Sequence, residues 1–292
     1  MNWPAKAGPL AGLRVLSLAG NIPGPLAVAR LHALGAAVCK VEPPGGDALA
    51  AACPAWYAAL HAGQEVIRLN LKDRADRAQL DPLLAAADLL ITASRPAGIA
   101  RLGLAWDDLH AAYPDLCQVA IVGHAAPAAD RPGHDLTYQV AAGLLVPPAL
   151  PRVLLADLAG AERAVAVALA LLLARQRGQG SGYREVALAE VAEDFAAPLR
   201  HGLTAPGGLL GGGLPSYNIY AAQEGWVALA ALEPGFVQRL QHSLHIAEIT
   251  HSALADIFRT QPAQTWEQWA IQHDLPLVAV HDPTANADHP SY

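Results

Sequence analysis

Short β-branched, apolar runs alternate with helix-like segments over roughly the first 125 residues, and this alternation constrains the fold more than any other feature. Strand-like runs lie at residues 13–18, 38–41, 66–71, 89–92 and 116–122. Helical spacing follows the first run, and a further helix is expected at residues 74–87. Because crossovers between parallel strands are right-handed, the pattern predicts an α/β fold with a mostly parallel, twisted sheet covered by helices.

The pattern changes after the proline-rich residues 146–151. Residues 164–174 are wholly apolar but too short for a membrane span, which needs about 20 residues, so they predict a buried helix. A glycine-rich turn then leads into a strand at 183–188, and a second glycine-rich stretch at 207–213 precedes a strand at 226–231. We therefore expect a large domain at residues 1–200 and a smaller α+β domain at 201–292.

The loop after the first strand argues against a nucleotide cofactor. It contains Gly20 and Gly24 with two prolines, which is not the G-x-G-x-x-G spacing that lets a backbone approach a pyrophosphate. No G-x-x-x-x-G-K-[ST] phosphate loop is present in the sequence either.

Composition excludes several other functions. A net charge of −7 without a basic block disfavours nucleic acid or an anionic membrane surface as partner. The N-terminal residues lack the apolar core of a secretory signal, so a cytoplasmic protein is expected. The three cysteines form no C-x-x-C pair, which indicates neither disulfides nor a metal site, and Cys39 and Cys117 are expected to be buried and inert. With 53% hydrophobic residues, the chain is expected to hide apolar surface in an oligomer.

Three side chains stand where loops give way to apolar helices, namely His134, Asp135 and Asp157. Helix N-termini favour negative charge, so a histidine and a carboxylate facing one cleft there could exchange protons with a substrate carbon. Simpler interpretations remain open: Asp157 and Asp135 as helix N-caps, His134 as a surface histidine, and Glu233 as an acid at a helix start.

Five motifs together resemble the family III CoA-transferases, and most closely the α-methylacyl-CoA racemases of that superfamily. They occupy residues 8–15, 40–47, 95–104, 131–135 and 175–180. The resemblance implies a Rossmann-like large domain, a small domain, and an interlocked homodimer with the active site between subunits. It also implies an acyl-CoA thioester as substrate and no tightly bound cofactor. Family members carry a further C-terminal segment that returns to the large domain, and we expect it to be absent here.

Carried over onto this chain, the resemblance makes His134 and Asp157 the two catalytic bases of a racemase, with Asp135 and Glu233 as acidic partners. In the transferase branch, the Asp157 position holds a nucleophilic carboxylate and the His134 position is typically not histidine. A racemase acting on a 2-methyl-branched acyl-CoA is therefore the first hypothesis, and a CoA-transferase using Asp157 the second. A degenerate paralogue that binds acyl-CoA without turnover is the third.

Proton abstraction beside a thioester carbonyl gives an enolate, and inversion needs an acid and a base on opposite faces of it. We expect the backbone N–H groups that follow Asp157 to stabilise the enolate oxygen. Where the family usually has a basic stretch for the adenosine phosphates, this chain has residues 61–65, which carry no lysine or arginine. The remaining candidates for binding CoA phosphates are Lys40, Arg68, Lys72, Arg95 and Arg101.

Overall fold

The computed structural model describes residue 3 and residues 6–281. The chain divides into two compact units, Met1–Ala196 and Ala197–Tyr292. Each unit has its own apolar core, and each is described by itself.

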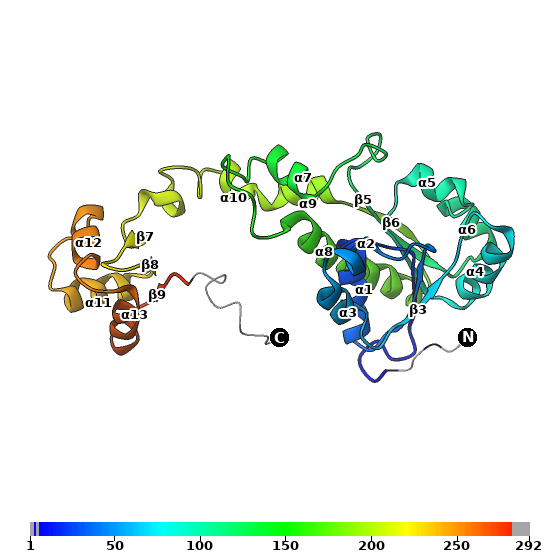
Figure 1. Ribbon diagram of the computed structural model, residues 1–292, viewed down its shortest axis with the longest axis horizontal. Helices are drawn as coiled ribbons and strands as arrows, with labels where there is room; N and C mark the ends of the chain where they lie inside the picture. The colour runs from blue at the N-terminus through cyan, green and yellow to red at the C-terminus, as the bar shows by residue number, and fades with distance from the viewer. Residues whose placement is uncertain (1–2, 4–5, 282–292) are drawn as a thin grey trace. The chain divides into compact units, whose positions relative to one another are not determined.

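The first unit contains the six-stranded sheet, which confirms the predicted α/β class (Figure 1). All five strand pairs are parallel, and the order β3-β2-β1-β4-β5-β6 is that of the doubly wound Rossmann fold. The strands are β1 (Arg14–Ser17), β2 (Ala37–Glu42), β3 (Glu65–Arg68), β4 (Leu89–Thr92), β5 (Cys117–Val122) and β6 (Tyr183–Ala187).

Helices cover both faces of this sheet because successive strand residues point to opposite sides. Val15 and Leu89 pack in one core with the first helical layer, whereas Leu16 and Leu90 pack in another core with the second. Figure 1 shows the second layer on the far side of the sheet from α1 and α3. The first layer is α1 (Pro23–Ala33), α3 (Pro54–His61), α8 (Leu155–Gln176) and α9 (Leu188–Phe195); the second is α4 (Arg74–Ala86), α5 (Pro96–Arg101) and α6 (Trp106–Ala112).

Strands β2, β4 and β5 are buried at every residue, as expected of strands covered on both faces. The burial predicted for Cys39 and Cys117 is confirmed. Burial raises the pKa of the Cys39 thiol to about 12, and the charge of Glu65 adds to this shift, so the thiol stays protonated and unreactive.

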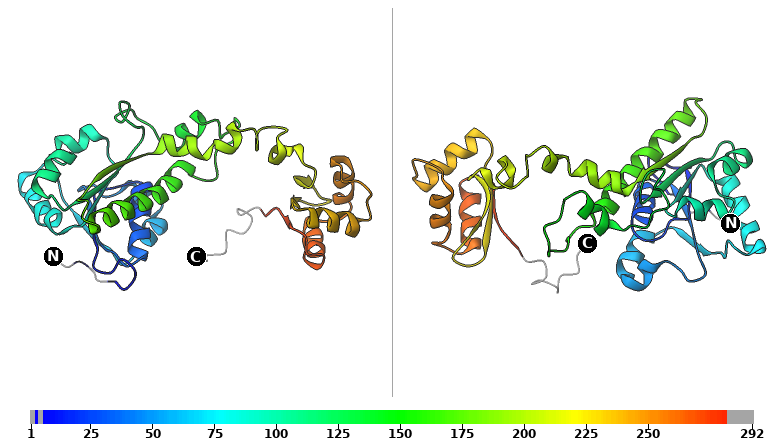
Figure 2. Two further views of the ribbon diagram at one scale, coloured as in Figure 1. Left: turned by 180° about the vertical axis from the view of Figure 1, so that it is seen from behind. Right: turned by 90° about the horizontal axis from the view of Figure 1, so that it is seen from above.

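The second unit is built on a small antiparallel sheet in the order β7-β8-β9. Buried and exposed residues alternate along β8, so one face of the sheet is covered, and Figure 2 shows the helices gathered on that face. Phe258 and Trp266 lie at the centre of its core. The elements are α10 (Ala197–Arg200), an irregular glycine-rich turn (Leu209–Gly213), β7 (Tyr217–Ala221), β8 (Trp226–Ala230), α11 (Pro234–Leu244), α12 (His251–Phe258), α13 (Ala263–Gln272) and β9 (Leu277–Ala279).

Among the described residues, none of the helices combines the length and the apolar character that crossing a bilayer requires.

Candidate active site

A cavity of about 210 Å³ lies where the strand order reverses between β1 and β4. Loops that follow β1, β4 and β5 line it, including Asn21, Ser94 and Gly123. Ligands of doubly wound folds bind at this position, outside the carboxyl ends of the strands. We call it the switch-point cavity.

His134 and Asp157 both line the switch-point cavity. His134 is exposed and occupies the N-cap position of α7 (Asp135–Ala141). Asp157 is the third residue of α8, whose N-cap is Leu154. The interpretation of Asp157 as the N-cap is therefore wrong, because the helix begins two residues before it. Asp135 is likewise the first residue of α7 rather than its cap.

Asp135 is buried and joins the two helices. Its carboxylate accepts a hydrogen bond from the backbone N–H of Asp157 at 3.1 Å and another from Gln139 Nε2 at 2.5 Å. Gln139 Nε2 also donates to the backbone oxygen of Val153 at 2.9 Å, just before α8. These bonds fix the first turn of α8, and hence Asp157, relative to α7.

The pKa of Asp157 is raised to about 7. Burial is the main cause, and the negative charge of Asp135 adds to it. A carboxyl group with this pKa is present in both protonation states at neutral pH, so it can give or take a proton there.

We expected the backbone N–H groups after Asp157 to stabilise an enolate. For Leu158, the next residue, this expectation is wrong. The Leu158 N–H donates to the backbone oxygen of Leu154 at 2.9 Å, and the N–H of Asp157 itself is bonded to Asp135. Arg95 and Arg131 are the two arginines among the residues that line the cavity.

Tyr138 and Arg131 line the cavity but were not among the predicted site residues. Tyr138 is buried, and burial together with the charge of Asp157 raises its pKa. Its ring packs so closely on Gly133 that a Cβ atom there would lie 2.5 Å from the ring. The sequence held a signal for it, because Tyr138 follows His134 by four residues and so lies in the first turn of the helix that His134 precedes.

Glu233 does not belong to the same unit as the other three candidates. It is the exposed N-cap residue of α11 in the second unit, and its carboxylate makes no capping hydrogen bond. The structure therefore groups His134, Asp135 and Asp157 within the first unit, and Glu233 separately in the second.

The predicted CoA-binding cations fall into different environments. Lys72 is exposed and lines a second, mainly apolar cavity of about 240 Å³. Ser94 borders both this cavity and the switch-point cavity, which also includes Arg95. Arg101 is exposed, and Arg68 is 63% exposed with its Nε 3.8 Å from Glu42 Oε2.

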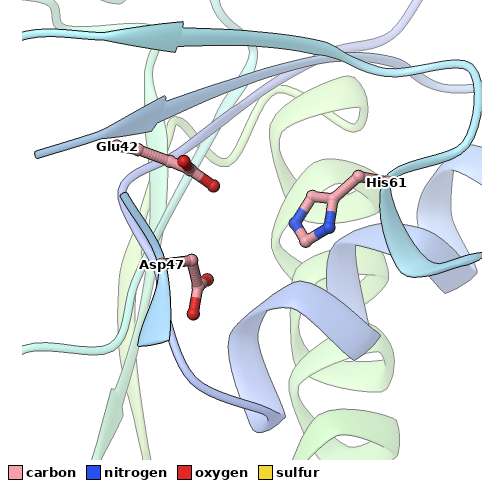
Figure 3. A group of neighbouring side chains, drawn as sticks. All are labelled: Glu42, Asp47 and His61. Carbon is pink, nitrogen blue, oxygen red and sulfur yellow. The ribbon is translucent and has the colours of Figure 1, made fainter. Parts of the chain in front are cut away.

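Lys40 is 2% exposed and lies inside the first unit, so it presents no cation to a bound phosphate. Its Nζ lies 2.5 Å from Asp47 Oδ2, 2.8 Å from His61 Nε2 and 3.1 Å from Glu42 Oε1. Figure 3 shows these three side chains pointing toward one another. Each has one possible ligand atom, and these atoms lie within 4.8 Å of one another, as in a metal site. The Lys40 ammonium contacts all three side chains, so it occupies the position that a metal ion would take.

Burial would raise the pKa of Asp47, but hydrogen bonds from Lys40 and from the Leu49 N–H outweigh it and lower this pKa overall. Asp47 Oδ1 also accepts a bond of 3.3 Å from the N–H of Asn21, which lines the switch-point cavity. Lys40 therefore acts through Asp47 on the wall of that cavity.

The profile of CoA-transferase family III matches residues 10–292. The chain belongs to this family. It is 33% identical over 212 residues to the probable fatty acyl-CoA transferase Rv3272 of Mycobacterium tuberculosis, covering 66% of this chain and 53% of that protein. It is 34% identical over 158 residues to the acetyl-CoA:oxalate CoA-transferase of Acetobacter aceti, covering 51% of this chain and 41% of that protein. The chain thus spans about half the length of these curated relatives.

The fold of this family member also matches solved structures. The crystal structure of Rv3272 has a TM-score of 0.84 at 27% identity, covering 98% of this chain and 88% of the other. A CAIB/BAIF family protein from Brucella suis has a TM-score of 0.78 at 22% identity, covering 97% of this chain and 86% of the other, which shows the common fold.

Proposed function

We propose that this family member is an acyl-CoA racemase or epimerase that moves a proton at the α-carbon of a 2-methyl-branched acyl-CoA. One observation carries the proposal: Asp157, with a pKa raised to about 7, lines the same cavity as His134. A substrate carbon between them would have an imidazole on one face and a carboxyl group on the other, and either group can exchange a proton with carbon.

The reaction balances with these two groups alone. The unprotonated base, which is either neutral His134 or ionised Asp157, takes the α-proton, and the electron pair of the C–H bond forms the enolate with the thioester carbonyl. The protonated group on the opposite face then delivers its proton to the same carbon, which inverts it. Asp157 protonated with His134 neutral serves one enantiomer, and Asp157 ionised with His134 protonated serves the other. Arg95 and Arg131 supply positive charge beside the developing enolate.

The two adjoining cavities suggest how CoA would bind. The nucleotide would occupy the apolar cavity beside Lys72, and the thioester would reach the switch-point cavity past Ser94, which borders both. Exposed Arg101 would bind phosphate from the outside. Lys40 is not part of this proposed site, because it is buried among acidic partners.

Incubation of a 2-methylacyl-CoA in heavy water tests the proposal. NMR of the substrate should show deuterium at the α-carbon, and His134→Ala and Asp157→Asn should each lower racemisation by about 10²- to 10⁴-fold. With one pure enantiomer, one variant should still exchange the proton and the other should not, with the preference reversed for the opposite enantiomer.

Matched controls are His201→Ala and Asp108→Asn, which change exposed residues outside the cavity. Both should leave exchange unchanged. If no acyl chain in a panel takes up deuterium, or if the controls lose as much activity as the site variants, the racemase proposal is wrong.

A CoA-transferase remains the second candidate, because the relatives above are named as transferases and Asp157 is a carboxylate in the cavity. Its carboxylate would attack the thioester carbonyl, expel the CoA thiolate and form a mixed anhydride. Hydroxylamine would then inactivate the enzyme during turnover, and mass spectrometry would find the label on the Asp157 peptide. If neither deuterium exchange nor this adduct occurs while CoA binds, a non-catalytic acyl-CoA-binding protein is the remaining explanation.

We also propose that the chain forms a homodimer. Several large apolar side chains after α7 are exposed, with Val146 80% and Leu150 75% accessible. Sedimentation at several protein concentrations should give the mass of two chains, and a single-chain mass throughout would contradict this.

A further inference from the structure

A third cavity of about 320 Å³ lies between the sheet and helices α5 and α6, and Ser94 borders it as well as the two cavities described above. Ile99 and Leu104 form its aliphatic wall, and Trp106 and Tyr183 form an aromatic wall in which the two rings stack with centroids 5.9 Å apart. We call it the α5–α6 cavity. Neither His134 nor Asp157 lines it, and neither does Lys72.

The sheet contributes two polar side chains to this cavity. Thr92 is 1% exposed and Gln118 is 2% exposed, and both line the cavity. They point to the same face of the sheet, since Gln118 pairs with Leu90, two residues before Thr92. Within the described residues, Thr92 Oγ1 and Gln118 Oε1 have no hydrogen-bond partner.

Buried polar groups normally have partners, and leaving an acceptor unpaired in an apolar surrounding is unfavourable. Gln118 Oε1 accepts only, and Thr92 Oγ1 can accept or donate. An apolar ligand that donates an O–H or N–H to Gln118 Oε1 would therefore pack against the apolar wall and give this buried acceptor a partner.

The lining also sets the charge and shape of such a ligand. Lysine, arginine, aspartate and glutamate are all missing from the described lining residues, so an ionised ligand would lose its hydration without compensation. Aromatic rings pack favourably on Trp and Tyr side chains. We propose that the α5–α6 cavity binds a small neutral aromatic molecule that carries a hydroxyl or amide hydrogen-bond donor. This inference does not depend on the proposed racemase activity.

Three probes that share one ring test the proposal by isothermal titration and ligand-observed NMR on the full chain. Neutral 4-methylphenol has the donor, toluene lacks it, and 4-methylbenzoate carries a charge. We expect 4-methylphenol to bind about tenfold more tightly than toluene, the upper range for one neutral hydrogen bond, and 4-methylbenzoate not to bind. Equal affinity of toluene and 4-methylphenol, or no binding of 4-methylphenol at its solubility limit, would overturn the proposal.

Two variants locate the binding. Gln118→Leu should remove the preference for 4-methylphenol over toluene while leaving toluene binding in place. Ala97→Phe, which fills the cavity from α5, should abolish binding of both, and Ala111→Phe on the exposed part of α6 should not. Unchanged binding in a folded Ala97→Phe protein would place the probe elsewhere and contradict the proposal. The comparison of probes on the unaltered protein stands even if a variant fails to fold.

Discussion

At the scale of single residues, Asp135 controls Asp157 in two ways, through a hydrogen bond to its backbone and through its charge. Asp135→Asn keeps an oxygen for the backbone bond but removes the charge. The pKa of Asp157 should therefore fall below its value of about 7 without reaching the ordinary aspartate value, because burial, the larger cause, remains. Titration of the labelled Asp157 carboxyl carbon by NMR measures this. An unchanged pKa would show that the two carboxylates do not interact.

Because its pKa is raised, ionisation of Asp157 at high pH lowers the free energy of unfolding. Its folded-state pKa of about 7 exceeds the value of about 4 expected in the unfolded chain, so the folded state binds the extra proton between these values. Stability therefore falls as pH rises from about 4 to about 7. Asp157→Asn should raise the melting temperature at pH 8 and change it little at pH 4. Asp108→Asn, on the exposed face of α6, is the control and should show no such pH dependence.

The site residues differ in how far the sequence could reveal them. That His134 and Asp157 face one cleft could be predicted from their motifs at loop–helix junctions, and the structure places both on one cavity; their catalytic roles stay a prediction. The position of Asp157 inside α8 could not, because the helix starts at Leu155 without any capping side chain to mark it. The burial of Lys40 was also missed, since its partners Asp47 and His61 meet it only through tertiary packing.

At the scale of elements, β2 is a fully buried strand whose charged residues need buried partners of opposite charge. Lys40 and Glu42 are both buried in it, and the Lys40 ammonium compensates Glu42 and Asp47 together. Lys40→Met should leave two carboxylates buried side by side and destabilise the fold by about 3–5 kcal/mol. Arg30→Met breaks an ion pair whose partners are 57% and 55% exposed, and should cost at most about 1 kcal/mol. Chemical denaturation measures the free energy of unfolding of both variants, and an equal decrease in the two would contradict this account.

At Gly24, helix α1 lies so close to the loops at the end of the sheet that no side chain fits between them. A Cβ atom on Gly24 would lie 2.2 Å from Ala19 Cβ and 3.4 Å from Ala93 Cβ, both in loops that follow β1 and β4. Gly24→Ala should therefore destabilise the protein by about 1–3 kcal/mol. Gly98→Ala in α5 meets no atom within 4 Å and should stabilise by up to about 1 kcal/mol through helix propensity. The difference in unfolding free energy between these two variants is the measurement, and similar values would refute the packing argument.

At the scale of the whole molecule, the class and the strand positions of the sheet followed from the sequence, because β-branched runs and helical spacing are local signals. The strand at 89–92 was predicted to the residue, and the others within a few residues. The strand order was not predicted, since pairing of β1 with β4 joins segments far apart in the sequence. The second unit has a core of its own, apart from those of the first unit.

Those separate cores predict that the two units unfold in distinct steps. Phe258 is fully buried in the second unit, 5.3 Å from the Trp266 ring and 5.4 Å from the Tyr220 ring. Phe258→Ala should destabilise this unit by about 3–5 kcal/mol, and Leu89→Ala should destabilise the first by about 2–5 kcal/mol. Differential scanning calorimetry should show each variant lowering a different transition while leaving the other in place. A single transition that moves equally in both variants would mean that the units unfold as one cooperative body despite their separate cores.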